Sequence, residues 1–342
     1  MADPRRILIF QTAYLGDLVL ATPLIDASQA LFPGAAIDLV TLPAWAPLVE
    51  HHPTLRQVIT FDKRGADRGL GGTRRLARRL RGEQYDLALC PHPSFRSALA
   101  LRIAGIPERV GFHDSAGAFL WTRKVRRDHA AHEVVRVLSL LEPFGGGEGA
   151  PAAPRVALDP KLDIASLKKR ISIGASEKLV GLHPGSAWAT KRWPAQRFGE
   201  LARALRSEFD RVLVFGTASE GPIVDEVLRY ADERTVGLAG ALSLSEFAAI
   251  ISQLSAFVTN DSGPMHVAAS FGVPVVAIFG STVPAFGYGP FGTRHRVVEQ
   301  GLYCRPCGPH GRTACPEKHF RCMLDTDVAA VSAALDALLA GH

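Results

Sequence analysis

The stretch 256-AFVTNDSGPMHVAAS-270 contains the pattern from which the fold follows. A short apolar run over Ala256–Thr259 is typical of a buried strand, and a helix is predicted to begin at about Gly263. Pro264 suits the first turn of that helix, because proline has no amide hydrogen to leave unpaired there. A polar loop therefore joins a strand to a helix, as in the repeating unit of an α/β sheet.

The same order of strand and helix patterns extends across the second half of the chain. Short apolar runs predict strands at Leu179–His183, Arg211–Phe215, Thr235–Leu238, Ala256–Thr259 and Val273–Phe279. An apolar stripe with helical spacing is formed by Phe198, Leu201, Ala202, Leu205 and Phe209, and Val328–Leu339 is the last predicted helix. This alternation favours a parallel sheet covered by helices on both faces.

The first half repeats the scheme, and a linker separates it from the second. Its predicted strands are Arg6–Phe10, Ala36–Thr41, Val58–Phe61, Leu87–Cys90 and Arg109–Phe112, and its last helical pattern is His132–Phe144. The segment Gly145–Pro154 is mostly Gly, Pro and Ala, as linkers are. We therefore expect doubly wound, Rossmann-like α/β domains at residues 1–150 and 151–325, with a C-terminal helix within 326–342. Ligands of such sheets bind at the carboxyl ends of strands, here in a cleft between the domains.

Size and charge agree with two soluble domains and indicate anionic partners. A chain of 342 residues exceeds what one core usually organises, and 47% hydrophobic with 21% charged residues is typical of a globular protein. No apolar run is long enough to span a bilayer, and Met1–Phe10 indicates a first strand and no signal peptide, so we expect a cytoplasmic protein. The net charge of +6 favours phosphates, acidic sugars, a lipid surface or nucleic acid. The basic run Arg74–Arg81 is interpreted first as a solvated helix face and second as a membrane-surface patch.

The loop after Thr259 has the features of an anion-binding site. Free amides at a helix start point outward, where the positive end of the helix dipole attracts anions. The amides expected to bind a phosphate group are those of Ser262, Gly263, Met265 and His266. Asp261 is too acidic to face that phosphate and is predicted to contact a ribose or to orient the loop. The alternative is an ordinary capped helix with His266 as a cap partner.

A second loop, 183-HPGSAWATKRWP-194, follows the first strand of the second half. Its polar residues, Ser186, Thr190, Lys191 and Arg192, are suited to neutralising a diphosphate leaving group. Solvated loop charge is the simpler interpretation of Lys191 and Arg192. However, this loop and the loop after Thr259 are both suited to binding anions and lie at the same edge of one sheet, which favours a diphosphate-binding role.

A third loop, 11-QTAYLGDL-18, joins the first strand to the first helix. Gly16 is expected to permit a tight turn and Asp17 to fall at the helix start, where capping is the commoner role. As a catalytic group, Asp17 is predicted to stay ionised with a low pKa and to take a proton from an attacking hydroxyl.

Four of the five cysteines, Cys304, Cys307, Cys315 and Cys322, lie in one short segment. Their spacing is compatible with a structural zinc site, for which His310 or His319 are alternative ligands. Four reduced thiols without metal are the other interpretation. Asp325-Thr326-Asp327 has the D-x-D form of metal-dependent sugar transferases, but capping of the final helix is the favoured role. No dinucleotide or P-loop glycine motif occurs.

In combination these stretches resemble glycosyltransferase family 9, particularly its lipopolysaccharide heptosyltransferase II group. In the first half the resemblance is carried by Gly16-Asp17, Ser94-Phe95-Arg96-Ser97-Ala98 and Gly105-Ile106-Pro107. In the second half it is carried by His183-Pro184-Gly185-Ser186, Lys191-Arg192-Trp193-Pro194 and Thr259–Ala269. The likeness covers nearly the whole chain.

The resemblance implies a GT-B fold and inverting transfer of heptose from ADP-L-glycero-D-manno-heptose to the lipopolysaccharide inner core. It implies that Asp17 is the general base, that Lys191 stabilises the diphosphate, and that the nucleotide is held by Asp261, Ser262, Gly263 and His266. The acceptor, lipid-anchored and anionic through Kdo, would contact Gly16 and Arg96 at the cytoplasmic face of the inner membrane. No cofactor is expected for catalysis, and any zinc at the cysteines would be structural.

Three other functions stay open on the sequence alone. The chain is compatible with heptosyltransferase I or III, or with transfer of another sugar. A nucleotide-sugar 2-epimerase shares the two-domain architecture. A basic nucleic-acid-binding protein is the weakest alternative, because the charge is dispersed and no known nucleic-acid module is present.

Overall fold

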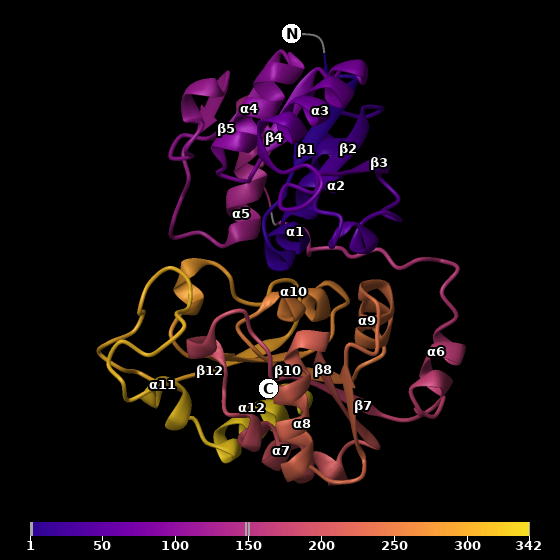
Figure 1. Ribbon diagram of the computed structural model, residues 1–342, viewed down its shortest axis with the longest axis vertical. Coiled ribbons are helices and arrows are strands. Elements are labelled where there is room, and N and C mark those ends of the chain that lie inside the picture. The colour runs from indigo at the N-terminus through magenta and orange to yellow at the C-terminus, as the bar shows by residue number, and fades with distance from the viewer. Residues whose placement is uncertain (1–2, 148, 150, 342) are drawn as a thin grey trace. The chain divides into compact units, whose positions relative to one another are not determined.

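The computed structural model describes residues 3–147, 149 and 151–341, and the chain divides into two units, Met1–Pro160 and Lys161–His342 (Figure 1). The division falls after the expected boundary at residue 150. The amide of Arg155 donates to Thr22 Oγ1 (2.8 Å) and that of Ala157 to the Leu48 carbonyl (2.9 Å), so the first unit holds these residues. Glu148 and Ala150 of the predicted linker lie outside the described residues.

The first unit is built on one parallel six-stranded sheet in the order β3-β2-β1-β4-β5-β6. Its strands are β1 (Arg6–Phe10), β2 (Ala36–Thr41), β3 (Leu55–Thr60), β4 (Leu87–Cys90), β5 (Glu108–Phe112) and β6 (Arg123–Val125). Its helices are α1 (Leu15–Ala21), α2 (Pro23–Leu31), α3 (Gly69–Gly82), α4 (Phe95–Ala104) and α5 (Glu133–Leu138). Short 3-10 turns lie at Ala46–Leu48, Ala118–Leu120 and Ser139–Phe144.

Helix α3 shows how the arginine-rich run folds. Leu76, Ala77 and Leu80 are buried against the core of the first unit, whereas Arg74 and Arg78 are exposed. The predicted amphipathic helix with a solvated basic face is therefore confirmed. Apolar residues every three or four positions form the buried stripe, and the arginines between them stay in water.

The second unit is also a parallel six-stranded sheet, in the order β12-β11-β10-β7-β8-β9. Its strands are β7 (Leu179–His183), β8 (Arg211–Gly216), β9 (Thr235–Ala239), β10 (Ala256–Asn260), β11 (Val275–Phe279) and β12 (His295–Glu299). Its helices are α6 (Ile164–Arg170), α7 (Ala195–Ala204), α8 (Gly221–Tyr230), α9 (Leu244–Ile251), α10 (Gly263–Ser270), α11 (Arg321–Leu324) and α12 (Val328–Leu339). Its 3-10 turns are Ala189–Lys191, Leu205–Ser207, Ala218–Glu220 and Pro284–Phe286.

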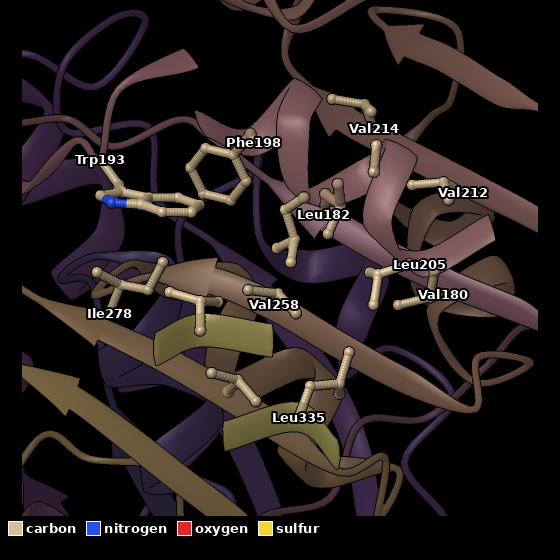
Figure 2. Packing of buried hydrophobic residues seen from close by; sticks show 14 of the residues in the cluster. Val180, Leu182, Trp193, Phe198, Leu205, Val212, Val214, Val258, Ile278 and Leu335 are labelled. Carbon is tan, nitrogen blue, oxygen red and sulfur yellow. The ribbon is translucent and has the colours of Figure 1, made fainter. Parts of the chain in front are cut away.

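The core of the second unit joins the predicted C-terminal helix to the sheet (Figure 2). Leu335 of α12 is fully buried in the same cluster as Leu182 and Val258 of the central strands. Trp193 packs edge-on against Phe198 at 4.9 Å between ring centroids, and its indole donates to the Thr326 carbonyl (2.8 Å). Helix α12 is therefore part of the second unit.

Two local differences from the sequence-based expectations have clear causes. Strand β6 has three residues and β12 is largely exposed, so neither carries the apolar run that marks the inner strands. The predicted helix over His132–Phe144 is α5 followed by a 3-10 turn that contains Pro143, which has no amide hydrogen for an α-helical bond.

Asp327 caps α12 through the Ala330 amide (2.7 Å), which agrees with the capping role. Among the described residues, no helix is long and apolar enough to cross a membrane.

Candidate functional site

In the second unit, the polar loops follow three neighbouring strands, β7, β10 and β11. Asn260, fully buried at the end of β10, ties two of these loops together. Its amide nitrogen donates to the Pro184 carbonyl (2.8 Å), and its side-chain oxygen accepts from the Trp193 amide (3.0 Å). Because both bonds span the loop that carries Lys191, Asn260 fixes that loop against the sheet edge. The sequence placed Asn260 in a motif but did not predict these two hydrogen bonds.

Lys191 and Asp261, predicted on separate loops, form an ion pair. Lys191 Nζ lies 2.6 Å from Asp261 Oδ2, and the Thr282 hydroxyl donates to the same oxygen (2.6 Å). Both side chains are largely buried, with 13% of Lys191 and 9% of Asp261 exposed. Asp261 therefore orients the lysine ammonium at the sheet edge. Thr282 was missed, although it follows the apolar run of β11 as the other loops follow theirs.

At the start of α10, two of the four amides expected to be free donate no hydrogen bond within the described residues. The amides of Ser262 and Gly263 donate to no group in the described part of the chain. The Ser262 hydroxyl lies 3.3 Å from His183 Nδ1, so its side chain faces the sheet. The free amide predicted at Met265 is wrong, because that amide donates to the Ser262 carbonyl (3.1 Å) and the side chain is fully buried. His266 is buried in the first turn of the helix.

The remaining residues of the second loop stabilise the loop itself. The guanidinium of Arg192 donates twice to the Ser186 carbonyl, at 2.9 and 2.7 Å, and so closes the loop. Thr190 is buried, and its hydroxyl lies 3.0 Å from Ser281 Oγ. Two of the four polar residues predicted to bind a diphosphate are cationic. The Arg192 guanidinium bonds to its own loop, whereas the Lys191 ammonium pairs with Asp261 of the neighbouring loop.

In the first unit, Asp17 lies in the first turn of α1. The helix begins at Leu15, so Gly16 is helical and does not form the expected tight turn. Asp17 Oδ2 accepts the amide of Tyr14 (3.1 Å), so the carboxylate also stabilises the helix start. Its pKa is raised to about 6, chiefly because it is withdrawn from water and secondly by the negative charge of Glu133. The low pKa expected from the sequence is therefore wrong.

Two further polar side chains, Lys63 and His92, accompany Asp17 on the same unit. Lys63 Nζ lies 3.2 Å from His92 Nε2 and 3.4 Å from Thr12 Oγ1. Burial lowers the pKa of Lys63, and burial with the nearby Lys63 cation lowers the pKa of His92 to about 4, so His92 is neutral at pH 7. Lys63 in turn lowers the pKa of Asp17. No spacing signal marked Lys63 or His92: Lys63 comes from the loop after β3, and His92 follows β4, which pairs with β1.

Arg96, which was expected to contact the acceptor, is held by several hydrogen bonds inside the protein. Its guanidinium donates to Thr73 Oγ1 (2.7 Å) and to the backbone carbonyls of Lys63 (3.0 Å), Gly69 (2.8 Å) and Asp67, and it lies over the Phe61 ring. Four of its N–H donors are thus used inside the protein. Arg96 shapes the loop that carries Lys63.

The cysteines lie near one another without a formed metal site. Cys304 Sγ is 3.8 Å from His319 Nε2, and the charges of Cys304 and Cys315 contribute, after burial, to raising the pKa of Cys307. Within the described residues, no three Cys, His, Asp or Glu side chains are arranged to hold a metal ion. The structural zinc stays a prediction, which metal analysis of the purified protein tests.

Comparison with known proteins places this geometry in context. Residues 73–319 match the model of "Glycosyltransferase family 9 (heptosyltransferase)". Lipopolysaccharide heptosyltransferase 2 of Escherichia coli (strain K12) is 31% identical over 86% of this chain and 87% of its own. Lipopolysaccharide heptosyltransferase 1 of Pseudomonas aeruginosa is 30% identical over 94% of this chain and 91% of its own. The solved E. coli ADP-heptose LPS heptosyltransferase II superposes with a TM-score of 0.83 at 26% identity, covering 98% of this chain and 99% of that one, in agreement with a GT-B fold.

Proposed function

Because the chain belongs to glycosyltransferase family 9, the heptosyltransferase family, we propose that it transfers heptose from ADP-L-glycero-D-manno-heptose to the lipopolysaccharide inner core. The chain is a glycosyltransferase by this membership. Relatives of types 1 and 2 both match, and we propose the type 2 reaction because that type matches in sequence and in solved structure. The observation that carries the proposal is the Lys191–Asp261 pair beside the unpaired amides of α10.

The donor diphosphate is proposed to bind to the second unit. The amides of Ser262 and Gly263 offer hydrogen bonds at the positive end of α10, where anions are stabilised. Lys191 adds a full positive charge, held in place by Asp261. As the bond between the sugar and the diphosphate breaks, negative charge grows on the leaving oxygen, and a fixed ammonium group stabilises that charge.

The acceptor is proposed to be activated on the first unit. Its hydroxyl oxygen attacks the anomeric carbon, the bond to the diphosphate breaks, and the hydroxyl proton passes to Asp17. Direct displacement of this kind inverts the anomeric carbon. A carboxylate whose pKa is about 6 is about nine-tenths ionised at pH 7 and is a stronger base than an ordinary aspartate, so the burial of Asp17 suits the step.

The rate is expected to follow the ionisation of Asp17. With its pKa raised to about 6, kcat/KM for the acceptor should be constant above about pH 7 and fall tenfold per pH unit below about pH 5. His92, with a pKa of about 4, adds no ionisation above pH 5. Rates measured from pH 4.5 to 8.5, after confirming that the protein stays folded, test this. A profile flat down to pH 4.5 would mean that Asp17 is not the base.

Lys63 replaces Arg96 as the proposed contact for the acidic groups of a Kdo-bearing acceptor. The Lys63→Ala variant should raise the acceptor KM about tenfold and leave the donor KM unchanged, because a charged hydrogen bond is worth roughly 1.5–3 kcal/mol. It should also move the acid limb of the pH profile upward, since Lys63 lowers the pKa of Asp17. Steady-state kinetics with each substrate varied in turn provide the measurement. Lys63→Arg, which keeps the charge, is the control, and an unchanged acceptor KM in Lys63→Ala would contradict the role.

The site of action is proposed to be the cytoplasmic face of the inner membrane, where a lipid-anchored acceptor would lie. The net charge of +6 and the exposed arginines of α3 support attraction to an anionic surface.

A panel of nucleotide sugars, incubated with and without a heptose-bearing Kdo acceptor, tests the proposed function. Nucleoside diphosphate should appear from ADP-heptose and only when the acceptor is present. Consumption of a donor without acceptor would favour the 2-epimerase. Binding to DNA or RNA that weakens steeply with salt, with no turnover of any donor, would favour the nucleic-acid alternative.

A further inference from the structure

The chain between β12 and α11, residues 300–320, contains no helix or strand (Figure 1). It nevertheless contacts the loop of Lys191 and the loop of Thr282, the residue that binds Asp261. Most of the cysteines lie in it. We call it the connecting segment. The proposed reaction uses none of its side chains, so its contacts call for a separate explanation.

One group of contacts reaches the loop of Lys191. The amide of Thr190 donates to the Arg312 carbonyl (3.1 Å), and the amide of Arg312 donates to Thr190 Oγ1 (2.8 Å). The same hydroxyl lies 3.1 Å from the Arg312 carbonyl and 3.0 Å from Ser281 Oγ. Thr190 is 3% exposed. The residue directly before Lys191 is thus bonded on both sides to the connecting segment.

Gly311 extends this contact to the lysine side chain. A Cβ atom at Gly311 would lie 2.3 Å from Trp188 Cβ and 3.1 Å from Lys191 Cγ. The backbone of the connecting segment therefore packs against the aliphatic part of Lys191. A glycine is needed here, because any side chain would displace Trp188 or the lysine.

A second group of contacts reaches the loop of Thr282, the residue that binds Asp261. The amide of Cys307 donates to the Ser281 carbonyl (2.9 Å). The guanidinium of Arg305 donates to the Thr282 carbonyl (2.8 Å) and pairs with Glu299 (2.7 Å), and only 5% of the Arg305 side chain is exposed. Both partners of the ion pair are thus supported from the same segment.

We propose that the connecting segment positions the Lys191 ammonium for the donor diphosphate, acting through Thr190 and Gly311. A lysine side chain has four rotatable bonds. If it were mobile in the free protein, it would lose conformational entropy when the donor binds. Packing at Cγ and a fixed backbone at Thr190 remove part of that loss before binding. Thr190 and Gly311 are positioning residues, and this role rests on the proposed donor site.

The Thr190→Val variant tests the proposal. It keeps the size of the side chain and removes the hydroxyl, which leaves the Arg312 amide without its acceptor. The donor KM and the calorimetric Kd for ADP-heptose should rise about tenfold, while the acceptor KM and the pH profile stay unchanged. Thr190→Ser should restore the wild-type values. In the Lys191→Ala background, Thr190→Val should have no further effect on donor affinity.

Gly311→Ala is the second variant, and Gly301→Ala is its matched control. A Cβ at Gly301 meets nothing within 4 Å, so this control should behave as wild type, whereas Gly311→Ala should weaken donor binding several-fold. Donor affinity unchanged in Thr190→Val and Gly311→Ala, with a large loss in Lys191→Ala, would overturn the positioning role and leave the proposed function intact. Equal effects of Thr190→Val with and without Lys191 would also overturn it. Donor affinity unchanged in Lys191→Ala would instead reject the donor site itself.

Discussion

Replacing Asp17 with asparagine is expected to lower kcat by about 10²- to 10⁴-fold, the usual contribution of a positioned general base. The asparagine side-chain oxygen still accepts the Tyr14 amide, so the start of α1 is retained. Because the donor is proposed to bind to the second unit, the Kd for ADP-heptose should stay within about twofold of wild type. Single-turnover kinetics for the rate and calorimetry for the donor make the two measurements.

Stability provides the internal control for that variant. The folded-state pKa of Asp17 is raised, so ionising this group opposes folding, and the wild type loses stability as the pH rises through about 6. Asp17→Asn carries no such charge and should have the higher thermal midpoint at pH 8. The difference should vanish below about pH 3.8, where the aspartate is protonated in both states. A variant that is folded, binds donor and keeps more than about a tenth of the wild-type kcat would contradict the base assignment.

Replacing Lys191 with alanine is expected to lower kcat/KM for the donor by about 10²- to 10³-fold, the scale measured for removal of one group that stabilises a leaving oxyanion. Two effects combine. The cation facing the diphosphate is lost, and the Asp261 carboxylate, 9% exposed, is left with the Thr282 hydroxyl as a donor and without its neutralising partner. A buried carboxylate without its cation repels the diphosphate.

A double variant separates the loss of the Lys191 cation from the repulsion by the Asp261 carboxylate. In Lys191→Ala/Asp261→Asn the repulsive charge is absent, so donor affinity should recover partly while kcat stays low. Isothermal titration with ADP and steady-state kinetics measure these separately. If Lys191→Ala bound ADP and turned over at wild-type levels, the lysine would be an ordinary loop charge, as its residue type alone indicates.

Much of the fold could be predicted because its signals are local. The inner strands β1, β2, β4 and β7 coincide with apolar runs that are buried on both faces of a sheet. Helix α12 was predicted to the residue, from its apolar spacing and the capping Asp327. Strands β6 and β12 escaped prediction because β6 has three residues and β12 is largely exposed, so neither carries a continuous apolar run.

The loops of the candidate site could be predicted from the sequence, but the contacts between their side chains could not. The sequence indicated that the loops of Lys191 and Asp261 share a sheet edge, but the ion pair depends on how each loop folds. The pKa of Asp17 is raised first by burial and then by Glu133, which α5 brings against α1 from far along the chain. Arg96 was expected to contact the acceptor from the family resemblance, and its hydrogen bonds to the 63–69 loop depend on how that loop folds.

The connecting segment illustrates the same limit. The spacing of its cysteines predicted a structural zinc site. Its contacts with the Lys191 loop, however, are made by Gly311 and the backbone of Arg312. Backbone contacts leave little trace in a single sequence.

The mass and anomeric configuration of the product most directly test the central claim that Asp17 and the Lys191–Asp261 site together perform a direct heptosyl displacement. ADP-heptose and a heptose-bearing Kdo acceptor are incubated with the protein, and the product is examined by mass spectrometry and proton NMR. The account predicts one added heptose whose anomeric configuration is opposite to that of the donor. A product with the donor's configuration, or donor consumed with no heptose added to the acceptor, would contradict it.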